Sequence, residues 1–75
     1  MSTKILDYAK IGARMKKLRL DADLTQILFA KRIGVTRSEI AKIETGKQKV
    51  YLKTLIKICQ EFDVSLDWLV FGDEK

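Results

Sequence analysis

The chain has no histidine, no proline and one cysteine, Cys59, among its 75 residues. A single cysteine cannot close an internal disulfide, which suits a reducing compartment. Without histidine the chain cannot build a cysteine–histidine zinc site, and we expect neither a metal nor another cofactor. The longest uninterrupted apolar runs are four residues, at 27–30 and 68–71, too short for a membrane span or a signal peptide. We therefore expect a cytoplasmic protein with no membrane partner.

The usual parts of a catalytic site are also missing. The sequence has no glycine-rich phosphate loop and no pair of carboxylates that its pattern would bring together, so we expect that it is not an enzyme. Positive charge is what the chain does have, with a net value of +5. Residues 1–57 carry a balance of +9 and residues 58–75 a balance of −4. A basic body with an acidic end is typical of a protein that binds polyanions, although a merely solvated basic surface would give the same count.

The apolar residues recur every three or four positions and do not alternate, which predicts an all-α fold. We expect one domain, residues 1–75, with helices at about 4–21, 25–33, 36–45, 51–62 and 65–71, and with mobile residues at 1–3 and 73–75. Ser2 or Thr3 is the expected N-cap of the first helix. The expected buried residues are Ile11, Met15 and Leu18, then Phe29, Ala30 and Ile33, then Ile40 and Ile43, and finally Leu52, Leu55, Ile56, Cys59 and Phe62 of the fourth helix.

The boundaries of the third helix carry specific signals. Thr36 is its expected N-cap, and Thr36 with Glu39 forms a capping box, in which each side chain accepts a hydrogen bond from the other residue's amide. Glu39 therefore has a structural role, since a carboxylate would be repelled by phosphates. Gly34 is expected to end the preceding helix with a positive φ, where glycine costs least.

The second and third helices are joined by about three residues, 34–36. A turn that short, with a glycine in it, predicts a helix-turn-helix, and Ala30 is the small residue that permits close contact with Ile40. In this motif the first helix lies over the DNA backbone and the second enters the major groove. The third helix has few apolar residues to bury, so its outer polar face is available for a partner.

The segment LTQILFAKRIGVTRSEIAKIETGK, preceded by IGARMKKLR and followed by VSLDWLVFG, resembles the phage-repressor and Cro type of helix-turn-helix domain, the XRE family. The resemblance covers roughly residues 11–72 and implies a compact five-helix, lambda-repressor-like fold. It implies a transcriptional regulator that binds double-stranded DNA sequence-specifically. The expected form is a repressor that binds a palindromic operator as a homodimer.

The resemblance also implies roles for individual residues. Arg37, Ser38, Ala41 and Lys42 match the base-contacting positions of the family. Gln26, Thr45, Lys47, Lys49 and, with a spare N–H, Arg19 match positions that contact phosphates. Arg19 and Glu44 match an arginine and a glutamate that pair inside the domain. An arginine at position 37 suits guanine, because a guanidinium can donate two hydrogen bonds to O6 and N7.

The last helix has apolar residues on two sides. Leu66, Leu69 and Val70 lie together, whereas Trp68 and Phe71 point roughly the other way. A helix of two turns cannot bury both sides in one small domain, and the resemblance implies a two-fold dimer at this end of the chain, with Trp68, Val70 and Phe71 in the interface. The alternative that stays open is that Trp68 packs on Ile5, Leu6 or Tyr8 of the same chain.

Two features depart from the family pattern. Ile27 and Leu28 stand where polar residues are usual, and Val50 stands where proline is frequent. An exposed Leu28 could contact a DNA sugar or a partner, or have no role. This leaves a second class of function open, an antitoxin-like or other protein-interaction module whose main partner is a protein such as a toxin or an antirepressor. Salt dependence separates the two classes, because phosphate contacts release counterions.

Overall fold

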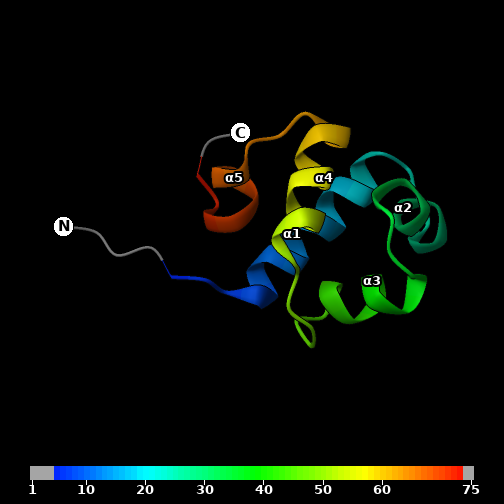
Figure 1. Ribbon diagram of the computed structural model, residues 1–75, viewed down its shortest axis with the longest axis horizontal. Coiled ribbons are helices and arrows are strands. Elements are labelled where there is room, and N and C mark those ends of the chain that lie inside the picture. Colours follow the sequence, from blue (N-terminus) through cyan, green and yellow to red (C-terminus); the bar gives the residue numbers. More distant parts are fainter. Residues whose placement is uncertain (1–4, 74–75) are drawn as a thin grey trace.

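The computed structural model describes residues 5–73, and within that range the chain consists of five helices joined by turns (Figure 1). The helices are α1 (Tyr8–Asp21), α2 (Gln26–Ile33), α3 (Arg37–Glu44), α4 (Leu52–Phe62) and α5 (Leu66–Phe71). The predicted all-α fold is confirmed, and α2 to α5 begin and end within one residue of the expected positions. In the described part of the chain, no helix has both the length and the apolar character that crossing a membrane requires.

The prediction for the start of α1 was wrong. The helix begins at Tyr8, and Asp7 is its N-cap, with Oδ1 accepting a hydrogen bond from the Lys10 amide at 3.2 Å. Aspartate is a strong N-cap, and its charge favours the positive end of the helix dipole. The predicted caps, Ser2 and Thr3, lie outside the described residues, as do all the residues expected to be mobile except Asp73.

The core lies where all five helices meet. The residues predicted to be buried in α1, α2 and α3 are all buried in the structure, each less than a tenth exposed. Around them, the Phe29 ring of α2 packs against the Phe62 ring of α4, with the ring centroids 5.3 Å apart. The guanidinium of Arg32 lies over the same Phe62 ring, 5.2 Å from its centroid, so that the rim of the core is covered by a cation–π contact.

The prediction for the buried face of α4 was wrong for two residues. Leu52 and Ile56 are exposed by 61% and 43%, whereas Ile58 is fully buried and Thr54 is 6% exposed. The sequence of α4 carries two overlapping apolar faces, and packing against α2 and α5 selects the one that contains Leu55 and Ile58. Leu52 and Ile56 therefore contribute to exposed apolar surface.

The main chains of α1 and α3 meet at Gly12. A Cβ atom on this residue would lie 1.9 Å from the carbonyl oxygen of Ile43, which is far inside van der Waals contact. Only a residue without a side chain therefore permits this separation between the two helices. Gly12 sets the position of α3 relative to α1.

Arg14 of α1 holds the C-terminal end of α5. Its Nη1 donates hydrogen bonds to the main-chain oxygens of Leu69 and Val70, both at 3.1 Å. These carbonyls lie in the last turn, where a helix leaves acceptors without intrahelical partners. Gly72 then ends α5 at φ +78°, and a Cβ atom there would lie 2.6 Å from Nη2 of Arg14. The guanidinium therefore fixes α5 on α1.

Candidate nucleic-acid interface

Helices α2 and α3 form a helix-turn-helix. Gly34 ends α2 in the left-handed conformation at φ +78°, and its amide donates to the carbonyl of Ala30 at 2.9 Å. The amide of Val35 donates to the same carbonyl at 3.0 Å. A residue with a Cβ would cost about 1–2 kcal/mol in this conformation. Ala30 and Ile40 are both buried, by 98% and completely, as expected for a close crossing of the two helices.

The start of α3 is fixed by the predicted capping box. Thr36 Oγ1 accepts a hydrogen bond from the Glu39 amide at 3.1 Å, and Glu39 Oε1 accepts one from the Thr36 amide at 3.2 Å. The Thr36 hydroxyl also lies 3.1 Å from Glu39 Oε1. The Glu39 carboxylate is thus used within α3, which fits the structural role that we assigned to it.

The outer face of α3 carries polar side chains that are exposed to solvent. Arg37, Ser38 and Lys42 are exposed, and none of their side chains forms a hydrogen bond or an ion pair with another residue in the range 5–73. Ala41 lies between them and is half-buried. The four residues predicted to contact bases are therefore on one short helix, and its three polar side chains are free to bind a ligand.

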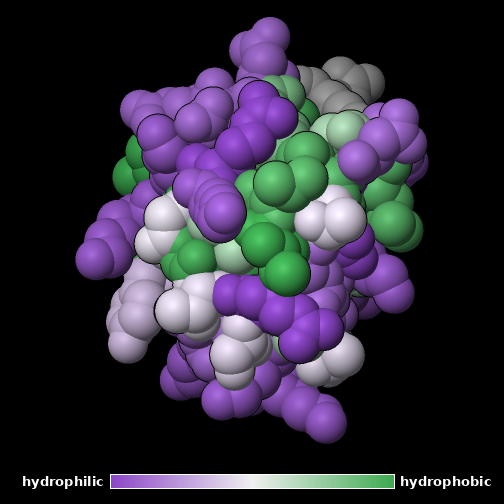
Figure 2. All heavy atoms as spheres, turned by 90° about the vertical axis from the view of Figure 1, so that its right-hand side faces the viewer, coloured by the Kyte–Doolittle hydropathy of each residue, from purple (hydrophilic) through white to green (hydrophobic). Residues whose placement is uncertain are grey.

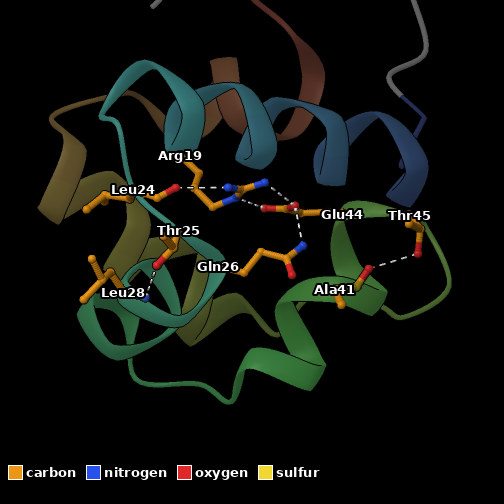
Figure 3. Close-up of polar contacts among 8 residues, drawn as sticks. All are labelled: Arg19, Leu24, Thr25, Gln26, Leu28, Ala41, Glu44 and Thr45. Atoms are coloured by element: carbon orange, nitrogen blue, oxygen red, sulfur yellow. Dashed lines mark hydrogen bonds and ion pairs between the residues drawn. The ribbon is translucent and has the colours of Figure 1, made fainter.

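A buried ion pair supports this face from behind (Figure 3). Arg19 Nε donates to Glu44 Oε2 at 2.7 Å, and Arg19 Nη2 donates to Glu44 Oε1 at 3.1 Å. The two side chains are only 10% and 3% exposed. A third donor, Nη1 of Arg19, reaches the carbonyl of Leu24 at 3.0 Å, so the pair also holds the turn between α1 and α2.

The same carboxylate positions Gln26 at the start of α2. Nε2 of Gln26 donates to Glu44 Oε1 at 3.1 Å, as the dashed lines in Figure 3 show. Thr25 caps the helix, with Oγ1 accepting from the Leu28 amide at 3.2 Å. One N–H of the Gln26 amide and two N–H groups of Arg19 are left over, because these side chains carry two and five donors. Both predicted phosphate-contacting residues therefore keep donors beside a helix N-terminus, where an anion is favoured.

These side chains surround a surface hollow of about 380 Å³, lined by Arg19, Thr25, Gln26, Ile27 and Arg37. The hollow joins a predicted base-contacting residue, Arg37, to the predicted phosphate-contacting residues Gln26 and Arg19. Ile27 is 54% exposed at its edge, and we did not predict a role for it from the sequence. Figure 2 shows the side of the molecule on which α2 lies, where hydrophobic side chains appear among hydrophilic ones.

The residues that follow α3 were also predicted to contact phosphates. The Thr45 hydroxyl donates to the carbonyl of Ala41 at 3.0 Å (Figure 3). It also lies 3.2 Å from the carbonyl of Lys42. A phosphate accepts hydrogen bonds but does not donate them, so this hydroxyl would have to turn away from α3 to bind one. Lys47 and Lys49 are exposed, and the Lys49 ammonium lies 5.9 Å from the centre of the Tyr8 ring. Their contacts with DNA stay predictions.

Other kinds of site find little support in the described residues. Within residues 5–73, no cluster of three or more histidine, cysteine, aspartate or glutamate side chains is arranged to hold a metal ion. Cys59 is half-buried against the core, and burial raises the pKa of its thiol above the ordinary value. A thiol that stays protonated in such a place serves as a small core residue.

The family model described as Helix-turn-helix matches residues 15–69, more than half of the chain. The chain belongs to the helix-turn-helix family. This helix-turn-helix protein is 38% identical over 65 residues to the antitoxin PezA of Streptococcus pneumoniae, covering 87% of this chain and 40% of PezA. It is 41% identical over 59 residues to the regulator YqaE of Bacillus subtilis, covering 79% of this chain and 51% of YqaE. It thus spans about half the length of these relatives. The control protein C.MunI of a Mycoplasma species is 37% identical, with 88% of this chain and 90% of C.MunI covered.

Solved structures give the same fold. The restriction-modification controller protein C.AhdI of Aeromonas hydrophila superposes with a TM-score of 0.76 at 30% identity, covering 84% of this chain and 96% of C.AhdI. SinR, crystallised in complex with DNA, gives a TM-score of 0.72 at 30% identity, covering 79% of this helix-turn-helix chain and 95% of SinR. The P22 c2 repressor shares the fold with a TM-score of 0.77 at 24% identity, covering 84% and 96% of the two chains. The predicted lambda-repressor-like fold is confirmed.

Proposed function

We propose that this chain binds double-stranded DNA sequence-specifically and regulates transcription, with α3 inserted in the major groove. The observation that carries the proposal is the exposed polar face of α3, whose side chains are free to bind a ligand. The Arg19–Glu44 pair holds α3 in place on its inner side, and Gln26 is hydrogen-bonded to the same Glu44 carboxylate. The relatives include named transcriptional regulators and a restriction-modification control protein, and SinR has been crystallised with DNA. The net charge of +5 adds attraction to a polyanion.

Base recognition is assigned to the outer face of α3. Arg37 stands at the N-terminal end, where a recognition helix approaches base edges, and its guanidinium matches the O6 and N7 of guanine. A bidentate pair of this kind discriminates by roughly 1–3 kcal/mol. Ser38 and Lys42 lie on the same exposed face. Ala41, between them, offers a methyl group to thymine or no contact at all.

Phosphate contacts are assigned to the two sides of α3. Gln26 and the spare donors of Arg19 lie at the start of α2, and Lys47 and Lys49 lie beyond the end of α3. Positive and amide donors on both sides would seat α3 between the two backbones that border a major groove. Thr45 belongs to this set only if its hydroxyl leaves the carbonyls of α3.

We propose that the protein acts as a homodimer through an apolar groove near α5. The groove has a volume of about 350 Å³, and its lining includes Leu6, Leu52, Leu66 and Phe71. Leu6, Leu52 and Leu66 are 54%, 61% and 40% exposed, and together they form an exposed apolar patch of a kind that is unusual on a monomeric protein. Of the residues predicted from sequence, Val70 and Phe71 line this groove. Trp68 is half-buried against the core and Val70 is 8% exposed, so most of both side chains is already covered in the single chain.

Dimerisation supports the repressor role that we propose. Two recognition helices about 34 Å apart read two half-sites one helical turn apart, so the operator would be a palindrome. A dimer multiplies the discrimination of each half-site against the many competing sites of a genome. Occupying such an operator would block transcription by preventing polymerase from binding.

Selection of bound sequences from a random DNA pool tests the proposal. We expect a two-fold symmetric consensus, and a binding constant that falls steeply with salt, by roughly 0.9 in log K per log salt for each neutralised phosphate. The double variant R37A/K42A should lose the preference for the selected sequence. The matched control is K17A/K57A, which removes two lysines that pair with acidic residues on their own helices. Equal selectivity in both double variants would refute the assignment of α3.

A second function, binding to another protein, is favoured by two observations. PezA, an antitoxin, is 38% identical over 87% of this chain, and a SinR structure is described as a complex with the SinI protein. Leu20 and Leu28 are exposed by 53% and 48%, outside the apolar groove. If this function dominates, a protein partner will co-purify with the chain from its host, and DNA binding will show a shallow salt dependence without sequence preference.

A further inference from the structure

Ile27 occupies an unusual place for an isoleucine. It is the second residue of α2, it is 54% exposed, and it lines the hollow that also contains Gln26 and Arg37. Its neighbours in the hollow are donors that suit phosphates and base edges. An apolar side chain gains nothing from such a ligand unless the ligand also brings an apolar group to it.

The major groove offers one apolar group on its base edges, the 5-methyl group of thymine. We propose that Ile27 determines specificity by contacting the 5-methyl group of a thymine that lies next to the base pair read by Arg37. The inference rests on the proposed function, since it requires α3 in the major groove. It adds a base contact from α2, whereas the base contacts proposed above all come from α3.

The geometry fixes Ile27 well enough for such a contact. Thr25 caps the first turn of α2, and the Gln26 side chain is tied to Glu44 at 3.1 Å. The two residues that precede Ile27 in this turn are thus restrained. An isoleucine in a helix adopts one χ1 rotamer in about 90% of cases, so its methyl groups are held in place before DNA arrives.

Leu28 provides a natural comparison. It is 48% exposed, close to the value for Ile27, but it does not line the hollow. Exposure alone therefore does not distinguish the two residues, whereas their positions relative to Arg37 do. A variant at Leu28 removes a similar amount of apolar surface from α2 without touching the proposed contact.

Replacing single thymines of the selected operator by deoxyuridine tests the inference, because uracil lacks only the methyl group. Binding of the full chain would be measured by fluorescence anisotropy for the unaltered protein, I27A, I27V and L28A. In the unaltered protein we expect uracil at one thymine of each half-site to weaken binding by about three- to fivefold, the value of one buried carbon group. The I27A protein should bind thymine and uracil operators equally at that position, whereas I27V and L28A should keep most of the difference.

The outcomes separate the inference from the proposed function. If every uracil substitution costs the same in I27A as in the unaltered protein, Ile27 makes no methyl contact, and the inference fails while sequence-selective binding stands. If L28A removes the methyl effect as completely as I27A does, the effect belongs to α2 as a whole and the inference also fails. A protein that prefers no duplex in the selection would overturn the proposed function and the inference together. Circular dichroism of each variant verifies that the helices are intact.

Discussion

The carboxylate of Glu44 accepts two hydrogen bonds from the guanidinium of Arg19, at 2.7 and 3.1 Å, between the last turn of α3 and the last turn of α1. The same carboxylate accepts a third hydrogen bond from Gln26 at the start of α2. One acidic side chain, 3% exposed, therefore connects three helices. Through it, the position of the proposed recognition helix depends on the residues that would contact the DNA backbone.

Removing the Glu44 carboxylate should be among the most destabilising changes to a polar residue. We expect E44A to lower the free energy of unfolding by about 3–5 kcal/mol, because it leaves the Arg19 charge buried without a partner. Urea denaturation followed by circular dichroism measures the change. The control is E61A, whose partner Lys57 is 47% exposed, and it should cost at most about 1 kcal/mol. Equal losses in the two variants would contradict the structural role of the buried pair.

A methyl group at position 12 should separate α1 from α3. G12A places its Cβ 1.9 Å from the Ile43 carbonyl oxygen, and we expect a loss of at least about 3 kcal/mol or failure to fold. G34A is the matched comparison, since nothing lies within 4 Å of its Cβ and only its φ of +78° opposes the substitution. It should cost about 1–2 kcal/mol. Thermal melts that rank G34A as the more damaging change would contradict this account of the helix contact.

The capping box at the start of α3 should contribute to stability and not to base recognition. We expect T36A to cost about 1 kcal/mol, because the Glu39 amide loses its acceptor. E39Q keeps an acceptor for the Thr36 amide and should cost less. Both variants should select the same DNA consensus as the unaltered chain. A changed consensus for E39Q would mean that Glu39 contacts a base.

The attachment of α5 should depend on Arg14. We expect R14A to expose the α5 amides to faster hydrogen exchange and to weaken dimerisation, because the carbonyls of Leu69 and Val70 lose a shared donor. K16A changes an exposed lysine two positions along the same helix and should leave α5 exchange unaltered. Exchange at α5 that is equally slow in R14A and K16A would show that core packing alone holds the helix.

The proposed dimer groove can be tested where substitution does not disturb the core. L52D places a charge on a side chain that is 61% exposed, and we expect it to give folded monomers by sedimentation and much weaker operator binding. I56D, at a residue that is 43% exposed but does not line the groove, is the control and should remain dimeric. Trp68 is a poorer test, because it is half-buried against the core and its loss would also destabilise the chain. A dimeric L52D protein would place the interface elsewhere.

Local signals in the sequence predicted most of the fold. Thr36 caps the helix that it was expected to start, and Gly34 ends α2 in the left-handed conformation, as expected. These features depend on a few neighbouring residues, so the sequence specifies them directly. The start of α1 was misplaced because several polar residues near the N-terminus can cap a helix, and Asp7 is the one used.

The features that sequence reasoning missed depend on contacts between distant segments. Gly12 is 31 residues from Ile43 in the sequence numbering, and no local pattern indicates that their main chains touch. Arg14 likewise meets carbonyls 55 and 56 residues away. From the sequence, Ile27 stood out only as a departure from the family pattern. Its position beside Arg37 could not be predicted, because it depends on how α2 packs on α3. Leu52 and Ile56 were misassigned because α4 carries two apolar faces.

The close approach at Gly12 has a consequence for how recognition can change. The angle at which α3 projects from the body is set by a main-chain contact, and the outward side chains take no part in it. Exchanging those side chains should therefore leave the docking angle intact, so that new DNA preferences can arise by substitution on the surface of an unchanged scaffold.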